Sequence, residues 1–173
     1  MSSIKECPVV YHQQVAWGDM DVFGHVNNVM YYRYIESARI DYLTQVDAFA
    51  HGLVTVVSSS SCRFYRPVYF PDLLKVGARV VELRNSGFRM SYVLDSNQQN
   101  QMVATGEAIE VMVDATTSEK AAMPMELRQS IARLEASMGH DLQLTEPQEK
   151  TRLGGLGRAL RENLDQIVPK MGK

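Results

Sequence analysis

Two carboxylates and an imidazole lie close together near the start of the chain. Asp19, Asp21 and His25 fall within one stretch of seven residues. This spacing first suggests a calcium loop of the EF-hand type, which needs oxygen ligands at positions one, three and five and a glutamate at position twelve. Here positions five and twelve hold Phe23 and Met30, so the sequence argues against calcium.

Other metal and nucleophile chemistry finds little support in the residues. His25 and the two aspartates would need further ligands from elsewhere to bind a transition metal. The serine hydrolase pattern G-x-S-x-G is absent, and neither Cys7 nor Cys62 stands in a catalytic or C-x-x-C motif. We therefore predict no metal and no cofactor, and are left with a carboxylate beside a helix.

A helix is predicted to begin directly after the loop 18–26. Apolar residues recur at i, i+4, i+7 and i+11, namely Tyr31, Ile35, Ala38 and Tyr42, and Asn27 or Asn28 stands at the capping position. A helix amino terminus has unpaired N–H groups and a partial positive charge, which stabilise a developing oxyanion. On the second stripe of this helix, Glu36 and Arg39 are one turn apart and are expected to form an ion pair.

The remaining pattern predicts strands and a second helix. Segment 9–17 is extended in character, and residues 53–57 and 62–66 are strand-like with a polar run between them. Residues 74–80 alternate apolar and polar, and turns at 85–87 and 96–100 lead into strands 89–95 and 102–113, giving an antiparallel meander. A helix follows over 123–137, with Pro124 in its first turn. The expected class is α+β.

Composition indicates one globular domain. The chain has 173 residues, a formal net charge of −2 and a pI near 6.1, which argues against nucleic-acid binding. No signal peptide or membrane span is recognisable, and the sparse cysteines favour a reducing compartment, so we expect a cytoplasmic protein with no membrane contact.

A composition change at 139–153 divides the chain. We expect a domain over 1–138 and a C-terminal extension over 139–173 that is partly helical and amphipathic. The glycine-rich stretch 154–157 does not follow a strand of a βαβ unit, so it does not indicate a dinucleotide site.

Residues 17–39, WGDMDVFGHVNNVMYYRYIESAR, resemble the signature of the 4-hydroxybenzoyl-CoA thioesterase family of hotdog proteins. The shared features are the Asp-x-Asp-x-x-Gly loop, the His-Val-Asn-Asn helix entrance, a tyrosine-rich first turn and the later Glu-x-x-Arg. Weaker agreement extends through Phe64-Tyr65-Arg66-Pro67 and Asp72, so the resemblance covers roughly residues 9–137. It implies a hotdog fold, in which an antiparallel sheet wraps around a long helix.

The resemblance also implies an activity and an assembly. Family members hydrolyse acyl-CoA thioesters, and acyl carrier protein thioesters are a close variant. Their sheets pair edge to edge and their active sites lie between subunits, so a homodimer or homotetramer is expected. Whether the acyl group is fatty or aromatic stays open.

Two residues are carried over from the family as catalytic candidates, and a third, His25, is added to them although some family members have an apolar residue there. Asp21 occupies the position of the family's catalytic carboxylate, and Asn28 the position whose backbone N–H polarises the thioester carbonyl. Asp21 would either attack the thioester or draw a proton from water, and the sequence does not choose between these routes. His25 is the third candidate. Asp19 is interpreted as an organiser of the loop.

Substrate contacts are expected from the same region and from basic residues. The candidates are Gly24, Asn27, Tyr31, Phe23, Arg66 and Arg89, with Arg84 as a further partner for the CoA phosphates. The acyl pocket is predicted to involve Phe23, Phe49 and Val57. Two other function classes stay open: a hotdog dehydratase or hydratase, for which His25 would be the acid or base, and a non-catalytic acyl-CoA binding module.

Overall fold

The computed structural model describes residues 3–50 and 52–147, which form five strands and two α-helices. The strands are β1 (Val9–Gln14), β2 (Leu53–Phe64), β3 (Leu73–Arg84), β4 (Gly87–Ser96) and β5 (Gln101–Asp114). The helices are α1 (Asn28–Gln45) and α2 (Met125–Ala136), with short 3-10 helices η1 (Ile4–Glu6) and η2 (Trp17–Asp19). The predicted α+β class is confirmed.

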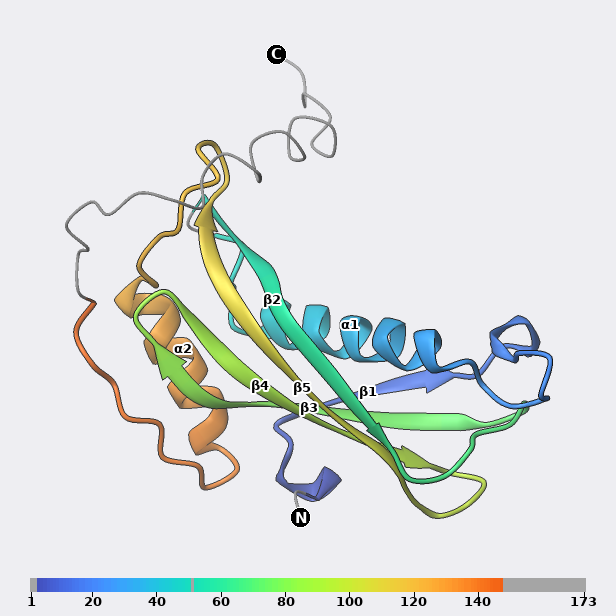
Figure 1. Ribbon diagram of the computed structural model, residues 1–173. Coiled ribbons are helices and arrows are strands. Elements are labelled where there is room, and N and C mark those ends of the chain that lie inside the picture. The colour runs from blue at the N-terminus through green and yellow to red at the C-terminus, as the bar shows by residue number, and fades with distance from the viewer. Residues whose placement is uncertain (1–2, 51, 148–173) are drawn as a thin grey trace.

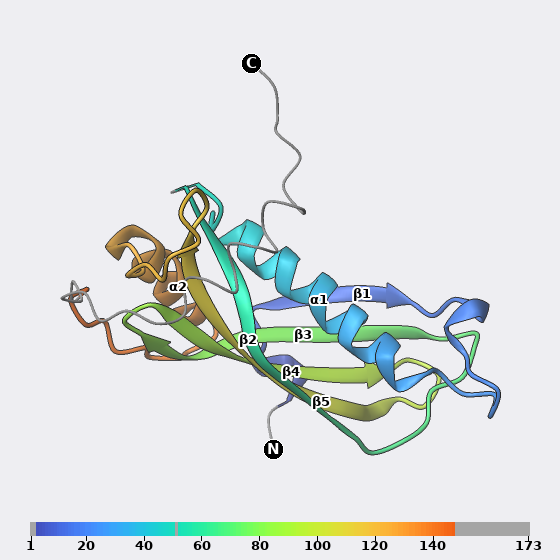
Figure 2. The same ribbon diagram turned by 45° about the horizontal axis from the view of Figure 1, so that its top comes forward.

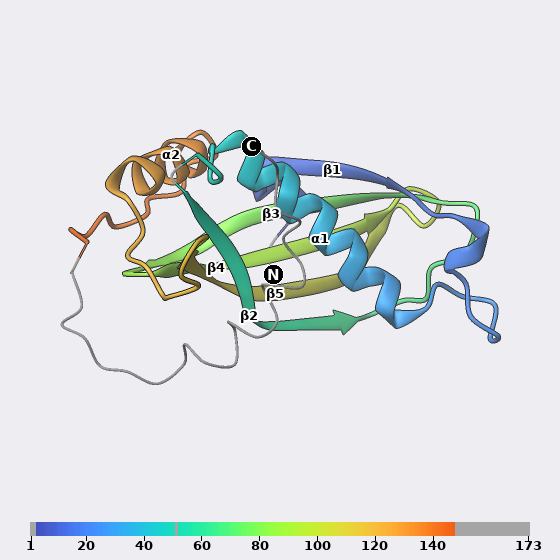
Figure 3. The same ribbon diagram turned by 90° about the horizontal axis from the view of Figure 1, so that it is seen from above.

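The five strands form one antiparallel sheet in the order β1-β3-β4-β5-β2. The predicted meander corresponds to β3, β4 and β5, and the two ends of the sheet are β1 and β2. The sheet curves, and α1 lies along its inner side, as Figures 1 and 3 show. This arrangement of a sheet around one long helix is the hotdog fold.

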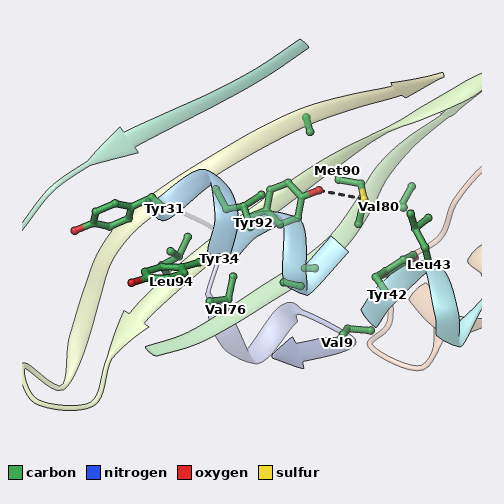
Figure 4. Packing of buried hydrophobic residues seen from close by; sticks show 14 of the residues in the cluster. Val9, Tyr31, Tyr34, Tyr42, Leu43, Val76, Val80, Met90, Tyr92 and Leu94 are labelled. Carbon is green, nitrogen blue, oxygen red and sulfur yellow. Dashed lines mark hydrogen bonds between the residues drawn. The ribbon is translucent and has the colours of Figure 1, made fainter. Parts of the chain in front are cut away.

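Helix α1 supplies much of the core, as its periodicity predicts. Tyr31, Ile35, Ala38 and Tyr42 are all buried between the helix and the sheet. Strand β3 faces them with Leu74, Val76, Ala78 and Val80, each fully buried, which is the alternation read from the sequence. Figure 2 shows the helix crossing the sheet, and Figure 4 shows its tyrosines among the strand residues. Burial of this stripe fixes the direction of α1 and hence the place of its amino terminus.

Helix α2 packs against β3 where a second helix was predicted, but it begins at Met125, with Pro124 as its N-cap rather than in its first turn. Its Glu135 is fully buried, where one carboxylate oxygen accepts from the Tyr42 hydroxyl at 2.8 Å and from the Val80 N–H at 2.6 Å. The other oxygen lies 2.8 Å from Nδ1 of His140. Three groups therefore compensate the desolvation of one carboxylate.

The predicted ion pair between Glu36 and Arg39 is wrong. Glu36 is paired instead with Arg33 at 2.9 Å on the surface of α1. Arg39 lies against the sheet, with its Nε 3.5 Å from a carboxylate oxygen of the buried Glu110 on β5. The buried carboxylate attracts the guanidinium that the helix presents to it, and this partner is distant in sequence.

Two strand boundaries also differ from the predictions. β1 ends at Gln14 rather than Trp17, because the chain turns into η2. β2 is continuous through the polar run 58–61, since main-chain pairing with β5 holds it extended and its serines are exposed at the sheet edge. A register shift between Val57 and Ser59 accommodates one extra residue.

The predicted C-terminal extension lies mostly outside the described residues. Its first part, 139–147, is described, and there Leu142 packs against the core. The expected amphipathic helix falls within 148–173 and stays a prediction. No helix in the described ranges is long and apolar enough to cross a membrane.

Candidate active site

The loop between β1 and α1 is folded back on itself by main-chain hydrogen bonds. Met20 and Val26 form an isolated antiparallel bridge. The Asp21 N–H donates to the His25 carbonyl at 2.9 Å, and the Val26 N–H donates to the Val68 carbonyl at 2.8 Å. These bonds tie the loop to the segment after β2 and hold Asp21 beside the amino end of α1.

Gly24 closes the turn of this loop. Its N–H donates to the Asp21 carbonyl at 3.0 Å, and its φ is +81°. A side chain added here would meet no atom within 4 Å, so lack of space does not explain the glycine. The positive φ does, because glycine adopts it without the steric cost of a Cβ atom. Gly24, predicted as a substrate contact, therefore shapes the loop that carries Asp21.

The two carboxylate oxygens of Asp21 have different surroundings. Oδ1 accepts a hydrogen bond from the Phe23 N–H at 2.9 Å, which stabilises the turn. Oδ2 lies 3.6 Å from Nδ1 of His25 and receives no hydrogen bond from the described residues. The Asp21 side chain is 19% exposed. One oxygen thus orients the carboxylate, and the other is available to a ligand.

The start of α1 contains a side-chain cap and a free main-chain donor. Asn27 is the capping residue, and its Oδ1 accepts from the Val29 N–H at 3.0 Å, which confirms the predicted helix start. Asn28 is the first residue of the helix. Within the described residues nothing accepts the Asn28 N–H, so this group carries the positive end of the helix dipole without a partner.

Asp21 and Asn28 line the same hollow, which has a volume of about 340 Å³. Its walls come from three segments of the chain. They are Asp21, His25 and Val26 of the loop, Asn28 and Tyr31 of α1, and Phe64, Tyr65, Arg66 and Pro67 at the end of β2. Four predicted site residues other than Asn28 are therefore brought together: Asp21, His25, Tyr31 and Arg66.

An aromatic pair forms part of the wall. The rings of Tyr31 and Phe64 pack edge to face, with centroids 4.9 Å apart and planes at 78°. Burial raises the pKa of Tyr31 to about 12, so its hydroxyl stays protonated at neutral pH. Tyr31 is thus a potential hydrogen-bond donor in an apolar wall and is unsuited to act as a base.

A family model described as the Thioesterase-like superfamily matches residues 15–131. This range contains the loop, both lining helical residues and all of the sheet except β1. The chain belongs to the Thioesterase-like superfamily.

Known proteins are similar to this chain over most of their own length. The long-chain acyl-CoA thioesterase FadM of Escherichia coli (strain K12) is 30% identical over 119 residues, covering 66% of this chain and 90% of FadM. A thioesterase from Thermus thermophilus, solved in complex with coenzyme A and Zn, is 31% identical with a TM-score of 0.69, covering 76% of this chain and 96% of that one. A protein from Pseudomonas aeruginosa strain PAO1 is 32% identical with a TM-score of 0.68 and coverages of 75% and 93%.

The arginines near the site differ in whether a carboxylate pairs with them. Arg66 lines the hollow, and no carboxylate in the described residues pairs with it. Arg63, on β2, lies with its guanidinium 5.7 Å from the Tyr65 ring centroid. Arg89 pairs with Glu82 at 3.1 Å and with Glu107 at 3.7 Å, and it does not line the hollow.

Arg84 is likewise paired with Glu82, at 2.8 Å. Arg84 and Arg89, both predicted as CoA contacts, therefore hold neighbouring carboxylates on the sheet in this structure. Arg66 is the predicted arginine that the fold brings beside Asp21 and Asn28.

Three predicted pocket residues do not line the hollow. Phe23 is 80% exposed at the loop tip, where its ring stacks on His25 with centroids 6.2 Å apart. Phe49 follows the carboxyl end of α1, at the opposite end of the helix from Asn28. Val57 lies on β2 near its register shift. These three residues lie away from the hollow of Asp21 and Asn28, so their part in an acyl pocket stays a prediction.

Four lining residues were not predicted from the sequence: Val26, Phe64, Tyr65 and Pro67. All four stand in the quoted motifs, but the place of Phe64 and Tyr65 in the hollow depends on the pairing of β2 with β5. Among residues 3–50 and 52–147, no group of three or more His, Cys, Asp or Glu side chains is arranged to hold a metal ion.

Proposed function

We propose that this protein hydrolyses acyl-CoA thioesters to the free acid and CoA at the hollow beside α1. One observation carries the proposal: Asp21, which has an open carboxylate oxygen, and Asn28, whose N–H has no partner among the described residues, line the same cavity. FadM, which is 30% identical, is named as a long-chain acyl-CoA thioesterase, and the Thermus thermophilus relative was solved with coenzyme A. Both relatives support a CoA thioester as the substrate.

Asn28 acts through its main chain. Its N–H donates to the thioester carbonyl oxygen, and the dipole of α1 adds positive potential at the same point. This interaction strengthens as negative charge develops on the oxygen, so it favours the transition state over the bound substrate.

Asp21 supplies the negative group that the reaction needs. Its Oδ2 either attacks the carbonyl carbon, forming an anhydride that water then cleaves, or removes a proton from water as the water attacks. In both routes a C–O bond forms, the C–S bond breaks and the CoA thiolate leaves with a proton from solvent. The bond from the Phe23 N–H to Oδ1 keeps Oδ2 directed to the reaction.

The other predicted site residues have supporting roles in this proposal. Tyr31 borders the acyl group with Phe64, and Asn27 fixes the helix start. Gly24 sets the turn that carries Asp21. His25 lines the hollow with a side chain that is 40% exposed, and its Nδ1 lies 3.6 Å from Oδ2 of Asp21.

Arg66 is proposed to contact the CoA moiety. It lies on the hollow, is free of carboxylate partners among the described residues, and its planar guanidinium matches phosphate oxygens. Arg89 would contact CoA only after leaving Glu82 and Glu107.

We also propose a homodimer that forms through β2, with a tetramer as the larger alternative, in a cytoplasmic protein. β2 is a sheet edge of 12 residues, and its segment 58–61 is exposed on one chain. An edge of this length presents unpaired main-chain groups that a second copy satisfies. Edge-to-edge pairing is also what the family resemblance implies.

The experiment is thiol release from a panel of acyl-CoAs that varies chain length and aromaticity, with wild type beside Asp21→Asn and Asp21→Ala. The proposal expects hydrolysis by wild type and a loss of about 10²-fold or more in both variants. Size-exclusion chromatography and circular dichroism control for folding and assembly. Full activity in the variants refutes the role of Asp21. Absence of wild-type hydrolysis, with hydration of an enoyl-CoA instead, would identify a hydratase.

A further inference from the structure

Asp19 connects three segments around the proposed active site. One of its carboxylate oxygens, Oδ2, accepts from the Ala16 N–H at 2.8 Å and from the Tyr34 hydroxyl at 2.6 Å. Its main-chain carbonyl accepts from the N–H of Asn27, the cap of α1, at 2.9 Å. Asp19 thus joins the end of the β1 segment, the body of α1 and the start of α1.

Tyr34 is a rigid anchor for this connection. The residue is 2% exposed and lies six positions after Asn28, about 9 Å along the helix axis. Burial and the hydrogen bond to Asp19 raise the pKa of Tyr34 far above its usual value, so its hydroxyl remains a donor. A buried ring on the most buried helix does not follow movements of a surface loop.

Each limb of the loop therefore has a different attachment. The returning limb is the part of the loop that leads into α1. It is held by the Val26 N–H, which donates to the Val68 carbonyl, and by the capped helix start. The outgoing limb, which carries Asp21 two residues after Asp19, is held to α1 by the Tyr34 hydroxyl. Without that bond, no side chain of the body of α1 holds the segment Trp17–Asp19, which keeps its local main-chain bonds, the bond from the Ala16 N–H and the bond from the Asn27 N–H to the Asp19 carbonyl.

We propose that Asp19 and Tyr34 form a positioning pair that fixes the Asp21 carboxylate relative to the Asn28 N–H. This pair adds positioning residues to the proposed function, and its expected effect on turnover rests on that function. Neither residue lines the hollow, so both act through Asp21. Displacement of a reacting group by about 1 Å is enough to reduce turnover strongly.

The pair requires Asp19 as an acceptor, whereas Asp21 is required as a charge. An asparagine at position 19 retains an oxygen that accepts from both Ala16 and Tyr34. An asparagine at position 21 loses the nucleophile or base. Asp19→Asn and Asp21→Asn are therefore the same chemical change, two residues apart, with opposite expected outcomes.

The chain offers a direct probe of the loop. Trp17 is its single tryptophan, is 73% exposed and starts η2, the segment that contains Asp19. Time-resolved fluorescence anisotropy of Trp17 reports the local motion of this limb without any substrate.

The experiment measures kcat, KM and Trp17 anisotropy for Tyr34→Phe, Asp19→Ala and Asp19→Asn. Tyr32→Phe is the matched control on the same helix, because its ring is 38% exposed and its hydroxyl bonds none of the described residues. Tyr42→Phe is the stability control, because it removes a buried hydroxyl from Glu135 far from the loop. Thermal unfolding is recorded for all five variants.

Tyr34→Phe and Asp19→Ala are expected to lower kcat by about tenfold to about a hundredfold with KM within about twofold, and to increase the motion of Trp17. Asp19→Asn, Tyr32→Phe and Tyr42→Phe are expected to retain kcat within about threefold and the wild-type anisotropy.

Wild-type kcat or anisotropy in Tyr34→Phe would overturn the pairing. The pairing would also be overturned if Asp19→Asn were as impaired as Asp19→Ala. The same holds if Tyr42→Phe matched Tyr34→Phe in both kcat and anisotropy. If wild type hydrolyses no thioester, the proposed function fails, and the anisotropy comparison still decides whether the pair holds the loop.

Discussion

Nδ1 of His25 lies 3.6 Å from Oδ2 of Asp21, beyond hydrogen-bond distance. The same nitrogen is 3.3 Å from the Val26 carbonyl, and the ring stacks on the exposed Phe23. A general acid or base acts within about 2.6 to 3.2 Å of its partner in the substrate complex. In this structure His25 is a neighbour of Asp21 that does not hydrogen-bond it, and its catalytic role stays a prediction.

His25→Asn is therefore expected to reduce kcat by less than about tenfold, because Asp21 keeps its bond from the Phe23 N–H. The pH profile of kcat should retain the same acidic limb in the variant. Acyl-CoA hydrolysis is measured from about pH 5 to about pH 9, a range that includes the ordinary pKa of histidine. A loss as large as that of Asp21→Asn would make His25 the acid or base and would favour the hydratase class.

Arg66→Ala is expected to raise KM for acyl-CoA by about tenfold with little change in kcat, because one charged hydrogen bond to a phosphate is lost. The effect should shrink at high ionic strength. Arg89→Ala is the matched control, since Arg89 is occupied by Glu82 and Glu107. Steady-state kinetics on one acyl-CoA at two salt concentrations compares them. A larger increase in KM for Arg89→Ala than for Arg66→Ala would assign the CoA contact to Arg89 and place CoA across the sheet face.

The two cysteines are expected to differ in alkylation. Burial raises the pKa of Cys62 to about 11 and that of Cys7 to about 12, and Cys7 is only 4% exposed. Because the thiolate reacts and its fraction grows about tenfold per pH unit below the pKa, labelling of Cys62 should still be rising between about pH 7.5 and about pH 9.5.

Iodoacetamide labelling followed by peptide mass spectrometry measures both sites, with the urea-unfolded chain as the control in which they react alike. Cys7 should remain unlabelled while the protein is folded. A labelling rate for Cys62 that levels off below about pH 9, or earlier labelling of Cys7, would contradict the burial of these thiols.

The features that could be predicted from sequence are those set by local spacing. The apolar stripe from Tyr31 to Tyr42 predicts the helix, and Asn27 predicts where it starts. Both signals are local, because caps and periodicity involve residues within a few positions. Asp19 was interpreted as a loop organiser, and its bonds to Ala16 and Tyr34 confirm this. The family motif then placed Asp21 at the helix entrance.

The features that could not be predicted depend on strand register. Arg39 finds Glu110 rather than Glu36 only because β5 passes beneath α1. Phe64 reaches Tyr31 only because β2 pairs with β5 along its length. A single sequence contains no local signal for such contacts, and residues chosen by type alone, such as Phe49, lie elsewhere.

The central claim is that the Asn28 N–H at the start of α1 activates the thioester. Asn28→Pro removes this N–H while leaving the helix intact, because proline is favoured at the first helical position and Asn27, at φ −61° and ψ 139°, already has the backbone that precedes proline. Asn28→Ala is the control that retains the N–H and loses only the side chain.

The decisive measurement is kcat for acyl-CoA hydrolysis by these two variants, with circular dichroism to verify α1. We expect Asn28→Ala to remain within about threefold of wild type and Asn28→Pro to lose about 10²-fold to 10³-fold. Equal kcat values in a folded Asn28→Pro and Asn28→Ala would contradict the account, because the reaction would then proceed without the donor at the helix terminus.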